Sequence, residues 1–273
     1  MIQVGMSAAP MAGAMATIAA LLEQRTGQQI GASRQWRLDA ALKPMLRDLA
    51  MTSLDELVTV LMTSRDTMLS DRVVDALLNQ ETSFFRDGTV LDQIGEALGT
   101  LRASRGGRRV RLWSAGCSTG QEPLSLAMLA DELQLAEATE IVATDVSQGA
   151  IARARLGRFS QFEVQRGLSV RRMIHWFEGE GAEWTARREL VNRIQFRRHN
   201  VAADAPPPGG FDLILCRNVL LYFAADVRAR VFDSLATALR PGGLLVLGAG
   251  ETVIGQTGRF VPSQRWRGFY EVN

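Results

Sequence analysis

The feature that most constrains the fold of this chain is a short apolar run that ends in a glycine-containing loop and continues into a helical pattern. The run covers 109–115, the loop 116–120 and the helix 122–133, with Pro123 in the first helical turn. In doubly wound α/β folds such a corner binds nucleosides and dinucleotides, because glycine lets a ligand approach the backbone closely. The run therefore predicts the first strand of a parallel sheet with a ligand site at its carboxyl end.

The same alternation of apolar runs and helical patterns continues towards the C-terminus. Runs that favour strands cover 140–146, 211–216 and 244–248, and helical patterns cover 147–156 and 227–239. Strands that alternate with helices predict a parallel sheet covered on both faces. Residues 89–273 are therefore expected to form an α/β domain.

The N-terminal part of the chain has a helical pattern throughout and no strand signal. Apolar residues recur at three- and four-residue spacing, so 16–88 is expected to form a helical domain behind a flexible tail, 1–15. Thr52 or Ser53, followed by two acidic residues, predicts a helix start. Pro44 is expected to begin or kink a helix.

One segment, 158–198, interrupts the alternation. It holds an excess of arginine over acidic residues, contains Gly179 and Gly181, and ends without a clean amphipathic helix. Its apolar and aromatic residues suit short strands, and these residues are Trp184, Thr185, Leu190, Val191, Ile194 and Phe196. The segment is therefore expected to be a small basic insertion with β structure. Its arginines either dock an acidic or peptide partner or form a solvated face.

Composition excludes several kinds of site and partner. Cys117 and Cys216 are the only cysteines and no Cys/His cluster surrounds them, so the sequence supports no metal site and favours a reducing, cytoplasmic compartment. No run reaches the ~20 apolar residues that span a bilayer, and no secretory signal is expected. A formal net charge of +2 gives no argument for nucleic acid binding.

Asp145 is the strongest candidate for contact with a ligand of the expected sheet. It ends the second expected strand, where an acid in such folds binds ribose hydroxyls. Because the loop 116–120 is not the GxGxxG fingerprint of pyrophosphate-binding enzymes, the combination favours S-adenosylmethionine over NAD. The alternative is that Asp145 or Ser147 is the N-cap of the next helix.

Two further polar residues have both a ligand-binding and a structural interpretation. Glu122 either attracts the positively charged end of the cofactor or is a favourable charge in the first turn of its helix. Asn200 either contacts the edge of adenine or is a turn residue.

Four long motifs occur along the chain. They read NQETSFFRD (79–87), WSAGCSTGQEP (113–123), FDLILCRNVLLYF (211–223) and PGGLLVLGAGE (241–251). Together they resemble the signatures of the chemotaxis receptor methyltransferase (CheR) family. The resemblance implies an N-terminal all-helical domain, a Rossmann-like class I methyltransferase sheet and a small antiparallel β-subdomain inserted into the sheet domain. It also implies S-adenosylmethionine-dependent O-methylation of glutamate side chains on the cytoplasmic helical bundle of chemoreceptors, for sensory adaptation.

The resemblance also implies a set of cofactor contacts. They are Gln80, Thr82, Arg86, Gly116, Glu122, Asp145, Asn200, Val201, Arg217 and Asn218. Two motif positions depart from the family, since Gln80 stands where Asn is common and Gln121 replaces the first of two acids. The basic residues of the family's second helix are represented here only by Arg34, Arg37, Lys43 and Arg47.

The implied reaction needs orientation more than proton transfer. A glutamate carboxyl has a pKa of about 4.3 and is ionised at neutral pH, so no general base is required. Arg86 is expected to aim the carboxylate with its planar fork, and Tyr222 to donate a hydrogen bond near the methyl group. The structural alternatives are an ion pair of Arg86 with Asp87 or the sheet domain, and a core position for the ring of Tyr222. His175 and His199 are expected to be structural or surface residues.

Two other functions stay open from the sequence. One is a related carboxyl methyltransferase that acts on a non-chemotaxis receptor array or another protein carboxylate, and the other is a non-catalytic cofactor-binding module. The expected partner is the cytoplasmic domain of a chemoreceptor, with a receptor tail peptide as a candidate ligand of the β-subdomain. A cytoplasmic monomer recruited to membrane-bound receptor arrays is expected, with neither nucleic acid binding nor membrane insertion.

Overall fold

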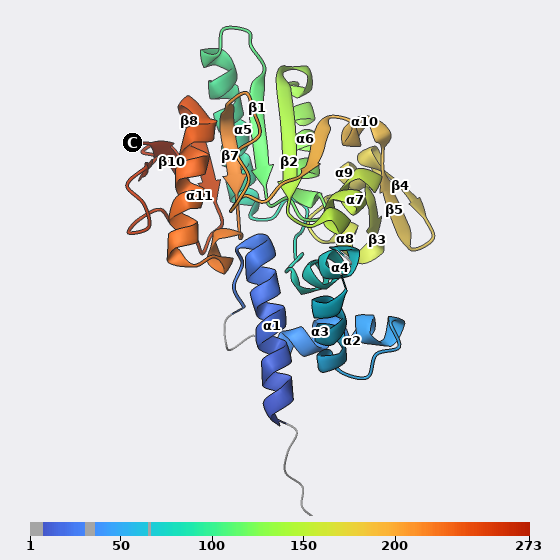
Figure 1. Cartoon of the computed structure of the whole chain (residues 1–273). Coiled ribbons are helices and arrows are strands. Elements are labelled where there is room, and N and C mark those ends of the chain that lie inside the picture. The colour runs from blue at the N-terminus through green and yellow to red at the C-terminus, as the bar shows by residue number, and fades with distance from the viewer. Residues whose placement is uncertain (1–7, 31–35, 65–66) are drawn as a thin grey trace, which may run out of the picture. The chain divides into compact units, whose positions relative to one another are not determined.

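The computed structural model describes residues 8–30, 36–64 and 67–273 (Figure 1). The chain divides into two compact units, each with its own core. The N-terminal unit consists of Met1–Asn79 with Tyr222–Ala224, and the sheet unit of Gln80–Leu221 with Ala225–Asn273. The division falls inside the motif 79–87 rather than after residue 88, and a short piece from the third motif joins the helices.

Four helices of the described chain make up the N-terminal unit. They are α1 (Ala8–Thr26), α2 (Trp36–Asp48), α3 (Leu54–Thr63) and α4 (Thr67–Leu77), and their buried apolar side chains include Ile18, Leu42, Leu57 and Val73. The start of α3 confirms the sequence signal. The Ser53 hydroxyl accepts the backbone N–H of Glu56 at 3.2 Å, and the Glu56 carboxylate accepts the backbone N–H of Thr52 at 2.9 Å.

One expectation about this unit is wrong. The expected tail is helical from Ala8 onward, because alanine and methionine are strong helix formers; residues 1–7 lie outside the described residues. Pro44 lies inside α2 and does not begin it, so the other expected outcome, a kink, stays a prediction. Of the basic residues expected near the second helix, Arg37, Lys43 and Arg47 lie in α2. Arg34 and the side chain of Arg37 fall outside the described residues.

The sheet unit is built on seven strands in the order β6-β2-β1-β7-β8-β10-β9. Figure 1 labels β2, β1, β7, β8 and β10 of this sheet. Their bounds are β1 Val110–Ala115, β2 Thr139–Asp145, β6 Ile194–Arg198, β7 Phe211–Cys216, β8 Leu239–Leu247, β9 Phe260–Pro262 and β10 Phe269–Val272. The strands from β6 to β8 pair in parallel, and β10 is antiparallel to both of its neighbours. The chain order reverses between β1 and β7, and ligands of such folds bind at the carboxyl ends of the strands beside this switch point.

Helices connect the strands and cover the sheet. They are α5 (Gly88–Ser104), α6 (Gln121–Glu132), α7 (Gln148–Leu156) and α11 (Ala225–Ala238), with short 3-10 turns η2 (Ala136–Ala138) and η3 (Leu220–Tyr222). Every residue of β7 is buried. Because successive side chains of a strand point to opposite faces, both faces of the sheet are covered, and the expected doubly wound α/β class is confirmed.

A three-stranded antiparallel sheet, in the order β3-β5-β4, lies between α7 and β6 in the sequence. This inserted segment consists of β3 (Arg158–Ser160), α8 (Gln161–Gln165), α9 (Val170–Trp176), β4 (Phe177–Glu180), β5 (Glu183–Ala186) and α10 (Arg188–Val191). The assignment of Ile194 and Phe196 to the insertion is wrong, because both lie in β6, which pairs with β2 of the large sheet. Leu190 and Val191 lie in a helix, since so short an apolar run carries no period that separates helix from strand.

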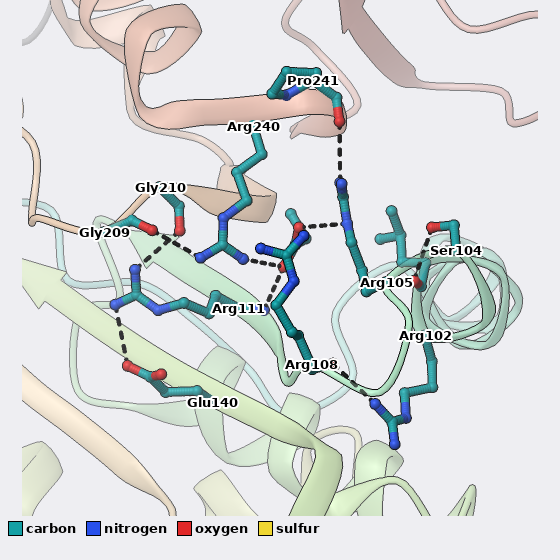
Figure 2. A network of polar contacts seen from close by, with 12 residues as sticks. Arg102, Ser104, Arg105, Arg108, Arg111, Glu140, Gly209, Gly210, Arg240 and Pro241 are labelled. Atoms are coloured by element: carbon teal, nitrogen blue, oxygen red, sulfur yellow. Dashed lines mark hydrogen bonds and ion pairs between the residues drawn. The ribbon is translucent and has the colours of Figure 1, made fainter.

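At the amino-terminal edge of the large sheet, the strands are tied together around one buried carboxylate (Figure 2). Asp212, in β7, is fully buried, and its carboxylate lies 2.8 Å from Arg105 Nε and 2.9 Å from Arg240 Nη1. It also accepts the backbone N–H of Arg111 at 2.8 Å. These contacts join the residue that follows α5 to strands β1, β7 and β8.

Arg111 and Arg240, both labelled in Figure 2, also hold the neighbouring turns. The Arg111 guanidinium donates to the carbonyl oxygens of Pro208 and Gly210 and pairs with Glu140 at 3.1 Å. Arg240 donates to the carbonyl of Gly209 at 2.8 Å. The amino edge is therefore a network of charges with fixed partners.

Candidate active site

The loop between β1 and α6 is built so that only glycine fits at two positions. Gly116 and Gly120 have φ angles of +83° and +99°. A Cβ on Gly116 would lie 2.4 Å from a methyl carbon of Val219, and a Cβ on Gly120 would lie 2.9 Å from that of Ala154. The backbone N–H of Gly116 also donates to the Thr144 carbonyl at 2.8 Å, which fixes the loop against the end of β2.

Asp145 ends β2 beside this loop. One oxygen of its carboxylate accepts the backbone N–H of Ser118 at 2.8 Å, and the other accepts that of Ser147 at 2.9 Å. The N-cap of α7 is Ser147, whose hydroxyl accepts the N–H of Ala150. Asp145 is therefore not the helix cap, and both of its oxygens are oriented by backbone N–H groups. Its role towards ribose stays a prediction.

Gln80 lies at the same corner of the sheet unit. Its side-chain amide donates to the Ser147 hydroxyl at 3.3 Å, and its backbone carbonyl accepts a hydrogen bond from the Ser118 hydroxyl at 2.9 Å. Ser118 and Ser147 are the residues whose N–H groups hold Asp145. The structure thus brings together Gln80, Gly116 and Asp145, three of the expected cofactor residues. Thr82 follows in the same segment and is half-buried.

Arg217, directly after β7, joins two carboxylates. Its side chain is 3% exposed, and Nη1 donates to Glu122 at 3.2 Å while Nη2 donates to Asp87. Nη2 also donates to the backbone carbonyl of Arg86 at 3.1 Å. The other oxygen of Glu122 accepts from the Ser114 hydroxyl at 2.7 Å. Glu122 is in the first turn of α6, so it is both a favourable charge at the start of a helix and a member of this polar cluster.

Asn218, the next residue, begins a loop that is held by Glu251. The Glu251 carboxylate accepts four backbone N–H groups, those of Asn218 at 2.7 Å, Gly248 at 2.9 Å, Leu220 at 2.8 Å and Leu221 at 3.3 Å. A Cβ on Gly248 would lie 2.9 Å from the Asn218 nitrogen and from the Glu251 carboxylate. One acid therefore organises the whole loop after β7.

Several non-glycine residues near Asp145 and Arg217 have backbone conformations in the left-handed region. Ser118 and Asn218 have φ angles of +50° and +60°, and Phe85 and Asp87 have +46° and +58°. Non-glycine residues in the left-handed region are uncommon and cluster at functional sites. All four belong to the sheet unit, in the loops after β1 and β7 and in the segment that Arg217 holds.

Asn200 takes the turn role that the sequence left open. Its side-chain oxygen accepts the N–H of Ala202 at 3.0 Å, and its own N–H donates to Asp204 at 2.8 Å. The preceding residue, His199, donates its backbone N–H to the Asp145 carbonyl at 2.9 Å, so this turn lies beside the end of β2. Contact of Asn200 with adenine, and of the half-buried Val201 with the cofactor, stays a prediction.

Arg86 contacts Glu81. Its Nη2 lies 3.8 Å from the Glu81 carboxylate, and Nη1 donates to the Glu81 carbonyl at 3.5 Å. Asp87, one of the two partners given as the structural alternative, is engaged by Arg217 instead. The Arg86 side chain is 32% exposed, so its guanidinium faces solvent in part.

Tyr222 belongs to the N-terminal unit. Its hydroxyl accepts a hydrogen bond from the Asn79 side chain, and its carbonyl accepts the backbone N–H of Gln29 at 2.8 Å. The ring lines a cavity of about 420 Å³ together with residues of α1, α2 and α4. The residue is half-buried and its hydroxyl has a side-chain partner, so its catalytic role and the alternative of a structural ring both stay predictions.

Comparison with known proteins decides among the functions left open. A protein-family model described as "CheR methyltransferase, SAM binding domain" matches residues 80–268. The matched residues include the glycine loop, Asp145 and the Arg217 cluster. The chain belongs to the CheR methyltransferase family. It is therefore an S-adenosylmethionine-dependent methyltransferase, and the Rossmann-like sheet is the cofactor-binding fold of an enzyme.

Curated CheR relatives cover most of the chain. Chemotaxis protein methyltransferase 1 of Pseudomonas aeruginosa is 36% identical over 240 residues, which is 85% of this chain and 87% of that protein. Chemotaxis protein methyltransferase 1 of Vibrio cholerae is 35% identical and covers 88% of this chain and 89% of its own length. The chemotaxis protein methyltransferase of Listeria monocytogenes is 33% identical over 70% of this chain and 72% of that protein.

The residues of this CheR chain fit S-adenosylmethionine. Gly116 and Gly120 leave the space that a Cβ would fill, and Asp145 presents an oriented carboxylate beside them. Asp87 and Glu122 place two negative charges against one arginine, which suits a ligand with a positively charged sulfur. The Nε of Arg217 is buried, and in the described part of the chain it has no hydrogen-bond partner.

The sequence missed two residues of this CheR site. Asp87 was considered only as a partner of Arg86, and Glu251 was quoted in the fourth motif without a role. A signal for Glu251 exists, since an acid just after a glycine-rich strand end can accept the N–H groups of a neighbouring loop.

The histidines and cysteines of the chain lie in structural surroundings. His199 stacks edge-on against Trp113, with its Nε2 3.0 Å from the Ala205 carbonyl, and His175 stacks against Trp176. Burial raises the pKa of both the Cys117 and Cys216 thiols, which makes them poor nucleophiles. Across 8–30, 36–64 and 67–273, no group of three or more His, Cys, Asp and Glu residues could hold a metal ion.

Proposed function

We propose that this chain esterifies glutamate side chains of chemoreceptors at the carboxyl edge of its large sheet, with Arg86 at the reacting carboxylate. The family resemblance also implies a catalytic role for Tyr222. The observation that carries the proposal is the state of Arg86. Its guanidinium is partly exposed and lies 3.8 Å from Glu81, while the adjacent Asp87 is engaged elsewhere. A loosely held guanidinium can form a bidentate pair with an incoming carboxylate.

The chemistry follows from the ionisation of the substrate. S-adenosylmethionine supplies a methyl group on a positively charged sulfur. When the cofactor is bound, Asp145 would hold the ribose hydroxyls, and Glu122 and Asp87 would favour the positive charge. Arg86 would orient the substrate carboxylate, and Tyr222 would donate the hydrogen bond that the family resemblance implies. Orientation of this kind can supply about 7–11 kcal/mol in favourable cases.

The remaining cofactor residues of the proposal come from the family resemblance. They are Gln80, Thr82, Gly116, Asn200, Val201 and Asn218. Arg217 enters as the residue that holds Asp87 and Glu122 in place, because both of its terminal nitrogens are already engaged.

The proposed partner is the cytoplasmic helical bundle of a chemoreceptor, with this chain acting as a cytoplasmic monomer recruited to receptor arrays. A receptor tail peptide would add to the edge strand β4 of the inserted segment. Arg187, half-exposed and 3.8 Å from Glu178, is suited to meet acidic side chains there. In the described ranges, no helix is long and apolar enough to cross a bilayer.

Labelled S-adenosylmethionine and purified receptor cytoplasmic fragments test the proposal. Base-labile methyl esters should form on glutamate residues, at a rate that does not change across neutral pH. Arg187→Ser should raise the apparent KM for a receptor that carries its tail and leave cofactor affinity intact. Label on another residue type, or a bell-shaped profile centred near neutrality, would contradict the proposed chemistry.

A further inference from the structure

Glu81, in the motif 79–87, lies between two arginines of the sheet unit. Its Oε1 accepts a hydrogen bond from Nη2 of Arg166, and its Oε2 lies 3.8 Å from Nη2 of Arg86. The hydrogen bond from Arg166, together with the charges of both arginines, lowers the pKa of the Glu81 carboxyl. One ionised carboxylate is therefore shared unequally, with the strong contact on Arg166 and the long one on Arg86.

Arg166 reaches Glu81 because the backbone beside it lies against the motif. Gly167 has a φ angle of +103°, and a Cβ at this residue would lie 1.8 Å from the carbonyl oxygen of Phe84. Only glycine permits so close an approach. The end of α8 in the inserted segment is thus placed beside the residues that precede Arg86.

Aromatic and cationic contacts hold the same two segments in one arrangement. The Phe84 ring packs edge-on against Phe159 and Phe177 of the inserted segment, with centroids 5.0 and 5.5 Å apart. Arg172 of α9 lies 3.7 Å from the centre of the Phe85 ring, and it pairs with Glu132 at 2.8 Å. The pairing of Arg166 with Glu81 therefore has a rigid frame.

We propose that Arg166 is a positioning residue of the transfer reaction, acting through Glu81 on Arg86. By engaging the Glu81 carboxylate, Arg166 keeps it from closing on Arg86, whose guanidinium stays available to a substrate carboxylate. Without Arg166, Glu81 would compete with the substrate for Arg86. The inference rests on the proposed function of Arg86, and it makes the inserted segment part of the active site.

The contacts favour this role over one in folding. Arg166 and Glu81 are each nearly half exposed, and exposed ion pairs contribute little to stability. If the pair of Arg166 and Glu81 were purely structural, removing Glu81 from a chain that already lacks Arg166 would not raise kcat. The competition that we propose predicts that kcat rises, because removal of the Glu81 charge would release Arg86 again.

The experiment measures kcat and KM of the full chain with a receptor cytoplasmic fragment. Arg166→Gln should lower kcat roughly tenfold with unchanged Tm and cofactor affinity, and Glu81→Gln added to Arg166→Gln should recover at least about threefold. Arg171→Gln, an equal loss of charge at an exposed position of α9, should stay within about twofold of the unchanged chain.

Two results would overturn the inference. One is an Arg166→Gln variant with the kcat of the unchanged chain, and the other is a double variant no faster than Arg166→Gln alone. Arg86→Ala separates these failures from that of the proposed function. If Arg86→Ala keeps full activity, the role of Arg86 itself is refuted; if it is slow while Arg166→Gln is fast, only the inference about Arg166 fails.

Discussion

The two edges of the large sheet use charged residues in opposite ways. At the amino edge, the fully buried Asp212 and its arginines have fixed partners. At the carboxyl edge, the non-glycine residues Ser118 and Asn218 hold strained conformations. Charges with fixed partners stabilise a fold, whereas strained loops with oriented acceptors are organised to bind a ligand.

The largest effect is expected from Asp212→Asn. The change keeps the shape of the side chain but leaves Arg105 and Arg240 beside a neutral group, and breaking a buried ion pair in this way costs about 3–5 kcal/mol of stability. Denaturant unfolding measures the loss. Cofactor affinity of the folded variant, measured at low temperature, should match that of the unchanged chain. A stable Asp212→Asn variant would mean that the amino edge does not depend on this charge.

The next effect is on rate rather than stability. Arg86→Ala should lose about 2–4 kcal/mol of transition-state stabilisation, by analogy with removal of one oriented donor. Arg86→Lys should recover only part of the rate, because an ammonium cannot aim both oxygens of a carboxylate. Steady-state kinetics with a receptor fragment measures both variants. Equal rates for Lys and Arg would show that charge alone matters at this position.

Glu251→Gln tests whether the loop after β7 depends on one carboxylate. An amide would turn its own donors towards some of the four N–H groups that the acid accepts, which should cost about 1–3 kcal/mol. Thermal unfolding and calorimetry with S-adenosylmethionine should both register the change. A variant with a lower Tm and unchanged cofactor affinity would show that Glu251 stabilises the fold and does not contribute to cofactor binding.

The smallest effect is expected from Tyr222→Phe. Loss of one neutral hydrogen bond should cost about 1 kcal/mol, and it should appear in kcat and not in KM. Because the Tyr222 hydroxyl also accepts from Asn79, Asn79→Ala is the matched control for loss of that contact alone. A change confined to KM would assign Tyr222 to substrate binding.

Much of the sheet could be predicted from the sequence because its signals are local. The strand 211–216 was predicted with the bounds that β7 has, since a fully buried strand is a continuous apolar run between turn signals. Asp145 was predicted to end the second strand, and β2 does end at this residue. Phe196 was misassigned because an edge strand of a large sheet and a strand of a small one share the same alternation.

The rest of the site depends on contacts between residues far apart in the chain. Asp87 and Arg217 are 130 residues apart, and Arg166 and Glu81 are 85 apart. No periodicity or spacing predicts such pairings, so the contact of Asp87 with Arg217 could not be predicted from the sequence. Arg86, by contrast, pairs with Glu81, which is only five residues away. Glu251 was missed although its place after a glycine-rich strand end was a signal.

The most direct test of the central claim compares two aspartates on opposite edges of one sheet. Asp145→Asn and Asp212→Asn make the same chemical change, and calorimetry with S-adenosylmethionine and S-adenosylhomocysteine measures each folded variant. We predict that Asp145→Asn weakens both ligands by at least about tenfold, the effect of lost hydrogen bonds to a charged group, while Asp212→Asn leaves them unchanged. Unchanged affinity in Asp145→Asn, or an equal loss in Asp212→Asn, would contradict the assignment of ligand binding to the carboxyl edge.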